Sequence, residues 1–479
     1  MEPGTRVDPT EAQPHEHGAL CHIVPPYLLQ RLEQHPDPAV QACARATLAA
    51  DAALREAGRQ PPSVAGSPRT SVTVAAPAPD RTISDARHER QLPGERVRAE
   101  GDPAVADEAV NQAYDGLGHT WALLLEEFGR DSLDGAGMPL HATVHYGRDY
   151  ANAFWDGERM VFGDGDGEVF TGFTGAVDVI GHELAHGVTE LTAGLVYRGQ
   201  PGALNESVSD VLGSLVKQRL AGQTAEEADW LIGAGLFTSA VQGEALRSLR
   251  APGTAYDDDV LGRDPQPATM ADYVDTSDDN GGVHINSGIP NHAFYLAATA
   301  IGGHAWERAG QVWFDVLTGG TLARDADFVA FAEATVATAA ARFGEGAPET
   351  DAITGAWRQV GVLDVAPADG PVPPAGADTG PDAEPPPAET PVYLCRTGGF
   401  AGVTRESRFR PAELPDPDAE RWTMLLVSDA LMQLAREEPA PDRFVYRVVA
   451  EQRHVDVTIA EQAVSDDVRD LFDRTLRLT

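Results

Sequence analysis

The sequence is poor in cysteine and in positive charge. Only Cys21, Cys43 and Cys395 occur in 479 residues, and because they are far apart and odd in number they indicate neither a disulfide framework nor a cysteine-rich zinc site. Lysine and arginine number 36 against 74 aspartates and glutamates, which gives a formal net charge of −38. A chain this negative repels a phosphate backbone, so nucleic acid is not expected as a partner.

Long apolar runs are also absent. No segment approaches the roughly 18 apolar residues that would cross a bilayer, so we expect no membrane association. Residues 1–6 hold one glutamate and one arginine and so no basic patch, and no apolar stretch of the kind found in an export signal follows them. These features predict a cytoplasmic protein, with export by a non-classical route as the alternative.

The remaining composition supports folded domains, because 42% of the residues are hydrophobic and 23% are charged. Changes in composition divide the chain into five parts. They are residues 1–65, which hold the motif Pro25-Pro26-Tyr27-Leu28-Leu29 and a helix at 35–57; a strand-rich part at 66–178; a helical part at 179–365; an acidic, proline-rich linker at 366–391; and a small α+β domain at 392–479.

Some elements can be predicted in more detail. A linker is expected at 59–69, and strands are expected from about residue 70. Asp102-Pro103 has the residue types of a helix start, so we expect an amphipathic helix at 103–128. In the last domain we expect strands at 392–396, 404–410, 444–451 and 454–460, and helices at 418–437 and 465–477.

The motif His182-Glu183-x-x-His186 lies in a stretch of helical character. Histidines four residues apart project from one helix face, so both imidazoles can reach one Zn²⁺ ion. A catalytic zinc needs a third protein ligand and an open position, and Glu206 is the candidate ligand. Asp210, one turn later, can accept the outer N–H of a ligating histidine. A chance motif without metal is the alternative, and the spacing of Glu206 and Asp210 argues against it.

These motifs resemble those of the thermolysin family of zinc metallopeptidases, in which His-Glu-x-x-His is followed by Asn-Glu-x-x-x-Asp. The resemblance covers about residues 70–362. It implies an α+β fold with a β-rich N-terminal lobe, a mainly helical C-terminal lobe and a zinc cleft between them. The implied activity is that of a zinc-dependent neutral endopeptidase. Further matching blocks lie at 152–155, 192–197, 245–248 and 279–288.

The resemblance also implies catalytic roles. One zinc ion would be bound by His182, His186 and Glu206, with Asp210 supporting a histidine ligand. Glu183 would be the general base, which suits a carboxylate beside water acidified by zinc. The oxyanion would be stabilised by His284 and Tyr197, with Asp279 orienting His284.

Substrate binding is implied in the same way. The peptide backbone would be held by Asn152, Ala153 and Arg247. The residue after the scissile bond would enter an apolar pocket, which implies cleavage on the N-terminal side of hydrophobic residues. The pocket residues are Phe170, Phe173, Val179 and Leu246.

One departure concerns calcium. Secreted members of the family carry a double calcium site built from several carboxylates, and Asp178 and Asp229 match two of them. Lys217, Leu231 and Ala234 stand where further carboxylates are expected. Because an ammonium group repels Ca²⁺, the double site is not predicted, and calcium binding elsewhere is left open.

The ends of the chain suggest regulation. Residues 1–65 resemble the short prosegment of the protealysin-like branch, which implies a cleft-blocking segment removed by self-cleavage within about 50–70. Cys21 and His22 could ligate zinc in the precursor, although an ordinary cysteine and histidine are the favoured interpretation. The block at 393–402 resembles emfourin, an inhibitor of protealysin-like enzymes, and an unrelated protein-binding domain is the alternative.

We therefore expect a monomer that acts on protein or peptide substrates, with its own prosegment and C-terminal domain as intramolecular inhibitors. One rival is a binding protein that keeps the fold without catalysing, and the presence of Glu183 and His284 argues against it. A second rival is a module that presents an inhibitor to another protease. Separate expression of 70–362 and 392–479 would discriminate between these functions.

Overall fold

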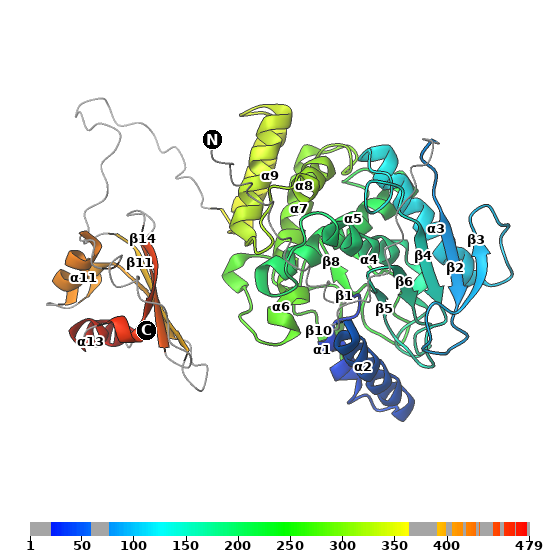
Figure 1. The fold of residues 1–479 in the computed structure, drawn as a ribbon, viewed down its shortest axis with the longest axis horizontal. Helices are drawn as coiled ribbons and strands as arrows, with labels where there is room; N and C mark the ends of the chain where they lie inside the picture. The colour runs from blue at the N-terminus through cyan, green and yellow to red at the C-terminus, as the bar shows by residue number, and fades with distance from the viewer. Residues whose placement is uncertain are drawn as a thin grey trace, which may run out of the picture. The chain divides into compact units, whose positions relative to one another are not determined.

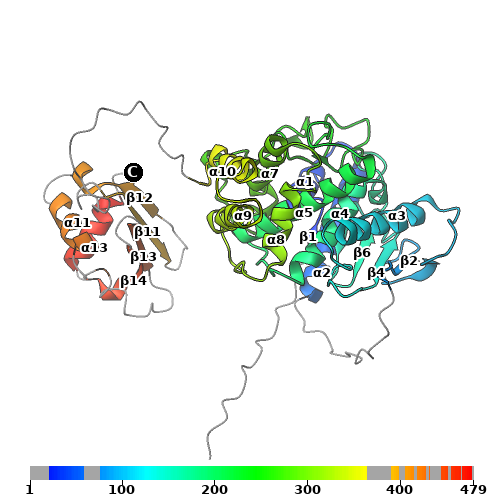
Figure 2. The same ribbon diagram turned by 90° about the horizontal axis from the view of Figure 1, so that it is seen from above.

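The computed structural model describes residues 21–58, 76–363, 390–398, 405–414, 418–427, 431, 444–450, 455–464 and 466–476. These residues belong to two compact units, Met1–Ala368 and Asp369–Thr479, which are described separately (Figures 1 and 2). The linker expected at 59–69, most of the linker expected at 366–391 and the start of the strand expected from residue 70 lie outside the described residues.

The first unit contains a six-stranded sheet. Its strands are β1 (Cys21–His22), β2 (Arg81–Asp85), β3 (Glu95–Ala99), β4 (Leu140–Val144), β5 (Ala153–Trp155) and β6 (Arg159–Phe162). Their order in the sheet is β1-β5-β6-β4-β2-β3, and β4 runs parallel to both β2 and β6 while the other pairs are antiparallel. Leu140, Ala142 and Val144 of the central strand β4 lie on one face of the sheet and are buried, and Thr143 on the other face is buried as well.

The edge strand β1 comes from the N-terminal part of the chain. It pairs antiparallel with β5, so that Cys21 faces Trp155 and His22 faces Phe154. Two helices follow it, α1 (Pro26–Leu32) and α2 (Pro38–Gly58), which are drawn in dark blue in Figure 1. The helix predicted at 35–57 is thus confirmed as α2.

The first helix of the sheet region begins later than predicted. It is α3 (Glu108–Ala122), and a π-helical turn at Leu123–Glu127 continues it. Its N-cap is Asp107, whose side chain accepts the backbone N–H groups of Ala109 and Val110. Asp102 instead accepts the N–H of Ala99 at 2.8 Å and closes the turn after β3. The predicted start at residue 103 was wrong because the carboxylate of Asp102 is used by this turn.

The rest of the first unit is mainly helical, which confirms the predicted two-part fold. Two short antiparallel pairs also occur, β7 (Leu231–Ile232) with β8 (Arg247–Ser248) and β9 (Asp257–Asp258) with β10 (Gly262–Arg263). The helices are α4 (Val177–Glu190), α5 (Gly199–Ala221), α6 (Asp279–Asn286), α7 (Gly288–Ile301), α8 (Ala309–Thr318), α9 (Phe328–Phe343) and α10 (Pro348–Gln359).

Helices α4 and α5 pack unusually closely at the centre of this unit (Figure 1). A Cβ atom added to Gly213 of α5 would lie 2.3 Å from the backbone oxygen of Asp178 in α4. A Cβ atom added to Gly181 of α4 would lie 3.0 Å from Cα of Gly213. The two glycines therefore allow the backbones to approach. All residues of α4 from Asp178 to Thr189 are buried, so this is a core helix.

The second unit is a small α+β domain. Its strands β11 (Val392–Gly398), β12 (Arg405–Phe409), β13 (Phe444–Ala450) and β14 (Val455–Ala460) form an antiparallel sheet of order β12-β11-β13-β14. Helices α11 (Asp418–Val427) and α13 (Asp466–Thr475) supply apolar residues to its core. Trp422 is fully buried, stacks on Phe472 and donates to Thr475 Oγ1 at 2.9 Å. The four predicted strands are confirmed, and most of the helix expected beyond residue 427 lies outside the described residues.

Among the helices that the structure describes, none combines the length and the apolar character needed to span a bilayer.

The close contact of α4 with α5 predicts that a methyl group added at Gly213 lowers the stability of the protein strongly. Gly213→Ala would push the added Cβ against the Asp178 carbonyl, so we expect a loss of about 1–3 kcal/mol of stability, measured by thermal or denaturant unfolding. The control is Gly355→Ala in α10, where nothing lies within 4 Å of the added Cβ and a small gain is expected. Equal stability of Gly213→Ala and the parent protein would contradict the proposed close contact.

Candidate metal centre and substrate cleft

Two histidines and a glutamate converge between α4 and α5. His182 Nε2 lies 3.1 Å from His186 Nε2 and 3.4 Å from Glu206 Oε2, and His186 Nε2 lies 3.5 Å from Glu206 Oε1. Ligands about 2.0–2.1 Å from a tetrahedral zinc ion lie about 3.3–3.4 Å apart. The three side chains therefore fit a zinc ion by their spacing, and all of them are buried.

The hydrogen bonds of the outer ring nitrogens support this interpretation. His182 Nδ1 contacts Asp210 Oδ1 at 2.8 Å, and His186 Nδ1 contacts Asn205 Oδ1 at 2.8 Å. With protons on both Nδ1 atoms, the lone pairs of both Nε2 atoms point into the centre. Two converging lone pairs and a buried carboxylate form a donor set that a divalent cation satisfies. Asn205 was not predicted, although its place directly before Glu206 was a signal that could have identified it.

Asp210 links the metal centre to a buried arginine. Arg247 Nη2 donates to Asp210 Oδ1 at 2.8 Å, and Asn291 Nδ2 donates to Asp210 Oδ2 at 2.8 Å. Burial would raise the pKa of Asp210, but Arg247 and His182 outweigh this effect and hold its pKa at about 2. The carboxylate is therefore ionised and can fix the ring of His182. Asn291 was missed because it lies 81 residues further along the chain.

Glu183 lies beside the three metal-binding candidates. Its Oε2 accepts the backbone N–H of Trp155 at 3.1 Å, and its Oε1 is buried without a hydrogen-bond partner among the described residues. Burial raises the pKa of Glu183 to about 8, against the opposing effect of His182. A divalent cation at the centre would lower this pKa, because an opposite charge favours the carboxylate.

The side chains of Tyr197 and His284 lie next to each other and beside Glu206. The hydroxyl of Tyr197 donates to Glu206 Oε1 and lies 3.3 Å from His284 Nε2. Asp279 contacts both the ring and the backbone of His284. Its Oδ1 lies 2.6 Å from His284 Nδ1, and its Oδ2 accepts the backbone N–H of His284 at 2.8 Å. Burial would lower the pKa of His284, but Glu206 and Asp279 outweigh it and raise the pKa to about 9.

An unusual turn brings Asp279 back to His284. Asp279, Asn280, Gly281 and Gly282 all have positive φ, between 52° and 86°. This left-handed conformation costs little for glycine and is tolerated by aspartate and asparagine. The glycine-rich sequence of the block at 279–288 is thus explained by the turn that it forms.

The residues predicted to hold a substrate backbone are hydrogen-bonded to the N-terminal segment that was predicted to be a prosegment. Val24 N donates to Asn152 Oδ1 at 2.9 Å, and Asn152 Nδ2 donates to Val24 O at 3.2 Å. Ile23 N donates to Ala153 O at 3.1 Å, and Arg247 Nη1 donates to Ile23 O at 3.1 Å. The structure therefore brings Asn152, Ala153 and Arg247 together around a peptide backbone.

The four predicted pocket residues belong to the large apolar core of the first unit, which also contains Ile23. Phe170 and Phe173 lie with their ring centroids 5.8 Å apart. The role of the four residues in selecting a substrate side chain stays a prediction. They are Phe170, Phe173, Val179 and Leu246, all at most 2% exposed.

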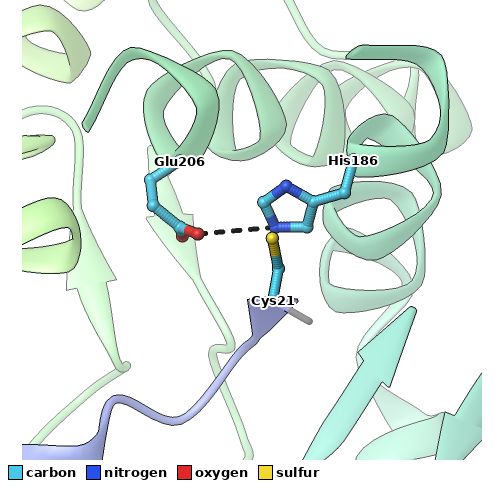
Figure 3. A group of neighbouring side chains, drawn as sticks. All are labelled: Cys21, His186 and Glu206. Carbon is cyan, nitrogen blue, oxygen red and sulfur yellow. Dashed lines mark ion pairs between the residues drawn. The ribbon is translucent and has the colours of Figure 1, made fainter. Parts of the chain in front are cut away.

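Cys21 and His22 form strand β1, which lies beside the candidate metal centre. The ligand atoms of Cys21, His186 and Glu206 lie within 4.8 Å of one another, and Figure 3 shows Cys21 reaching from its strand toward the other two. The side chain of His22 turns away, with Nε2 3.2 Å from Asp51 Oδ1 in α2. The structure thus places the cysteine, rather than the histidine, at the metal centre.

Lys217 stands at a position where secreted members of the family are expected to have a calcium-binding carboxylate. Its Nζ lies 3.0 Å from Asp178 Oδ2 and 2.8 Å from Asp229 Oδ1, and it also donates to the carbonyl of Leu231. Asp178 accepts the backbone N–H of Gly233 as well, at 3.2 Å. The ammonium group therefore joins α5 to α4 and to the segment around β7.

Comparison with known proteins identifies the family. The profile of the thermolysin metallopeptidase catalytic domain matches residues 80–190, that of the α-helical domain of the same family matches 193–362, and that of emfourin matches 394–476. The chain belongs to the thermolysin family of metallopeptidases, whose members are zinc-dependent hydrolases. The expected family and its C-terminal emfourin domain are confirmed.

Several relatives match over most of their length. The "Extracellular metalloprotease" of Pectobacterium carotovorum subsp. carotovorum is 51% identical over 345 residues, which are 72% of this chain and 96% of the relative. "Protease PrtS" of Photorhabdus sp. (strain Az29) is 51% identical over 284 residues, 59% of this chain and 76% of the relative. The solved structure of the precursor of protealysin, a metalloproteinase from Serratia proteamaculans, is 51% identical, covers 72% of this chain and 100% of its own, and has a TM-score of 0.65.

The prediction of a cytoplasmic protein was wrong. It rested on the composition of the first residues, whereas the Pectobacterium relative and a 41% identical "Extracellular minor metalloprotease" of Serratia marcescens (strain ATCC 21074 / E-15) are named as extracellular enzymes. The composition of the first residues was therefore not evidence for where the protein acts.

The contacts of Lys217 predict that the protein depends on this side chain and not on calcium. Lys217→Met would leave the buried Asp178 carboxylate without its cation, so we expect a loss on the order of 3 kcal/mol in thermal unfolding. The control is Arg219→Met, also in α5, whose partners Glu126 and Glu127 are exposed and partly exposed, so that its loss should cost at most about 1 kcal/mol. A clear rise in the unfolding temperature of the parent protein on adding calcium chloride would argue against this account.

Proposed function

We propose that this zinc metalloendopeptidase cleaves peptide bonds on the N-terminal side of hydrophobic residues and acts outside the cell after its prosegment is removed. One observation carries the proposal. The atoms of His182, His186 and Glu206 converge beside Glu183, next to three groups that already hold a peptide backbone. The extracellular names of the relatives support the proposed location.

The chain's own residues would divide the reaction between them. His182, His186 and Glu206 would hold a zinc ion, which would polarise the peptide carbonyl and acidify water. Glu183 takes the proton of the attacking water and passes it to the leaving amine. The Nε2 side of His284 and the hydroxyl of Tyr197 donate hydrogen bonds to the oxygen that becomes negative.

The remaining roles concern position. Asp279 holds the ring of His284 through Nδ1, which directs Nε2 toward the cleft. Asp210 holds His182 and Arg247 together, so the arginine that binds the substrate carbonyl is tied to a zinc ligand. Because Glu183 and His284 are both in place, the structure favours an enzyme over a binding protein that has lost catalysis.

The preference for a hydrophobic residue follows from the burial of the downstream side of the cleft. Ile23 of the prosegment is fully buried, and its backbone is held by Arg247 and Ala153. A substrate residue bound in the same way would place its side chain among apolar neighbours. Discrimination between similar apolar residues would be modest, since one methylene group is worth about 1–3 kcal/mol in such a pocket.

The C-terminal unit would regulate the enzyme as a tethered inhibitor. The emfourin match over residues 394–476 supports this role. A flexible linker gives an attached domain an effective concentration on the order of mM. The acidic, proline-rich sequence at 366–391 has about 26 residues, and a coil of that length would span roughly 25–30 Å. Recognition of a substrate or partner is the alternative role.

The proposed general base predicts a selective loss of catalysis. Glu183→Gln should keep one zinc per chain and lose several orders of magnitude in the rate of casein hydrolysis, because only the proton acceptor is changed. Metal analysis and the hydrolysis assay measure the two properties. Glu190→Gln is the matched control, since this exposed residue lies on the same helix and should keep full activity. Near-normal turnover of Glu183→Gln would exclude the mechanism.

The proposed tethered inhibitor predicts that a shorter chain is more active. Once the prosegment is gone, a chain ending at Val365 should have a higher kcat/KM than the full-length chain at protein concentrations too low for inhibition between molecules. A dilution series of both proteins measures this difference. Equal specific activity throughout the series would leave recognition of a substrate or partner as the role of the C-terminal unit.

A further inference from the structure

The prosegment passes through the cleft in the register of a substrate. Strand β1 extends the sheet beside β5, and the chain continues past the metal centre as Ile23 and Val24. Both backbone groups of Val24 are bound by Asn152, and those of Ile23 are bound by Ala153 and Arg247. An apolar residue therefore stands where the proposed specificity places the residue after the scissile bond.

The same register places one peptide bond at the centre of the cleft. The carbonyl oxygen of His22 lies 3.1 Å from His284 Nε2, the atom assigned to stabilise the negative oxygen of the reaction. The bond between His22 and Ile23 thus has the acceptor contact and the downstream residue of a bond to be cleaved. Some feature of the precursor must keep this bond intact while the prosegment blocks the cleft.

Cys21 is placed to be that feature. It is only 5% exposed, and its Sγ lies within 4.8 Å of ligand atoms of both His186 and Glu206 (Figure 3). Glu206 Oε2 is buried without a hydrogen-bond partner among the described residues, and it lies 3.4 Å from His182 Nε2, a spacing that a shared cation explains. A catalytic zinc keeps one position open for water, whereas a zinc with four protein ligands is closed.

We propose that Cys21 is the fourth protein ligand of the zinc ion in the precursor, and that its thiolate protects the His22–Ile23 bond by excluding the attacking water. The proposal rests on the proposed function of the site. Binding of Cys21 forms a sulfur–metal bond and releases the thiol proton to solvent. Without the sulfur, water can add to the carbonyl carbon of His22, the bond from that carbon to Ile23 N breaks, and the amine leaves with a proton.

The register explains why the side chain of His22 is not used. Adjacent residues of a strand point to opposite faces, so Cys21 and His22 cannot both face the metal centre from β1. His22 instead contacts Asp51, which also accepts Tyr150 Oη at 2.6 Å and Asn152 Nδ2 at 3.1 Å. This buried cluster anchors α2 to the catalytic part of the unit and fixes the strand in its register.

The ligand can be tested without catalysis. The full-length Glu183→Gln precursor, which keeps all metal ligands, is loaded with Co²⁺ and its absorption spectrum is recorded. We expect a thiolate-to-cobalt charge-transfer band that is lost in Cys21→Ser and kept in Cys43→Ser, which removes the other buried cysteine of the prosegment. Absence of the band in the parent, or its persistence in Cys21→Ser, would overturn the proposal.

The protection can be tested with Glu183 in place. Freshly purified full-length precursors are incubated with zinc, and their fragments are identified by mass spectrometry. Cleavage between His22 and Ile23 should be at least tenfold faster in Cys21→Ser and Cys21→Ala than in the parent or Cys43→Ser. Equal rates would contradict protection by the thiolate.

The two tests separate the proposal from the function on which it rests. If the chain were not a peptidase, no variant would cleave casein or itself, yet the cobalt spectrum would still report whether Cys21 is a ligand. If the chain is a peptidase and the band is absent, only the role of Cys21 fails. Thermal unfolding of each precursor identifies a variant that has not folded, and Cys21→Ala then replaces Cys21→Ser.

Discussion

The close approach of α4 and α5 is the constraint on which the rest of the structure depends. A side chain at Gly213 would overlap the backbone of α4. The two helices can approach this closely only because residue 213 is a glycine. Their approach sets His182 and His186 of one helix opposite Glu206 and Asp210 of the other. Asp210 also contacts Arg247 of β8, so the proposed metal centre and a proposed substrate-binding residue are linked by one carboxylate. The buried carboxylate of Asp210 can be tolerated there because the guanidinium of Arg247 stands against it.

The prosegment uses the groove that this helix pair creates. Its strand joins the edge of the sheet at β5, and its backbone takes the hydrogen bonds that a substrate would take. Main-chain pairing of this kind provides affinity without demanding a particular sequence. The apolar side chains of Ile23 and Val24 then supply burial, and the helices that follow anchor the strand through Asp51. Under the proposed function, inhibition by the prosegment and recognition of substrates would use the same donors and acceptors.

The sequence predicted those features that depend on local spacing. His182 and His186 lie one helical turn apart, as do Glu206 and Asp210, so their shared faces follow from helix geometry alone. Contacts between distant segments were less accessible, and neither Asn291 against Asp210 nor the placement of Cys21 rather than His22 at the centre follows from spacing. The start of α3 was misplaced because Asp102 and Asp107 are equally good caps in sequence and only the turn after β3 decides between them. The cytoplasmic location failed for a different reason, since it was inferred from a missing signal rather than from a residue that is present.

The central claim is that peptide hydrolysis occurs at one metal ion held by His182, His186 and Glu206. The most direct measurement is a zinc titration of the matured protein after the metal has been removed with a chelator. The account predicts that the stripped protein does not hydrolyse casein, and that activity returns in proportion to added zinc until one equivalent is bound per chain. Full activity of the metal-free protein, or a requirement for a second equivalent of zinc, would contradict it.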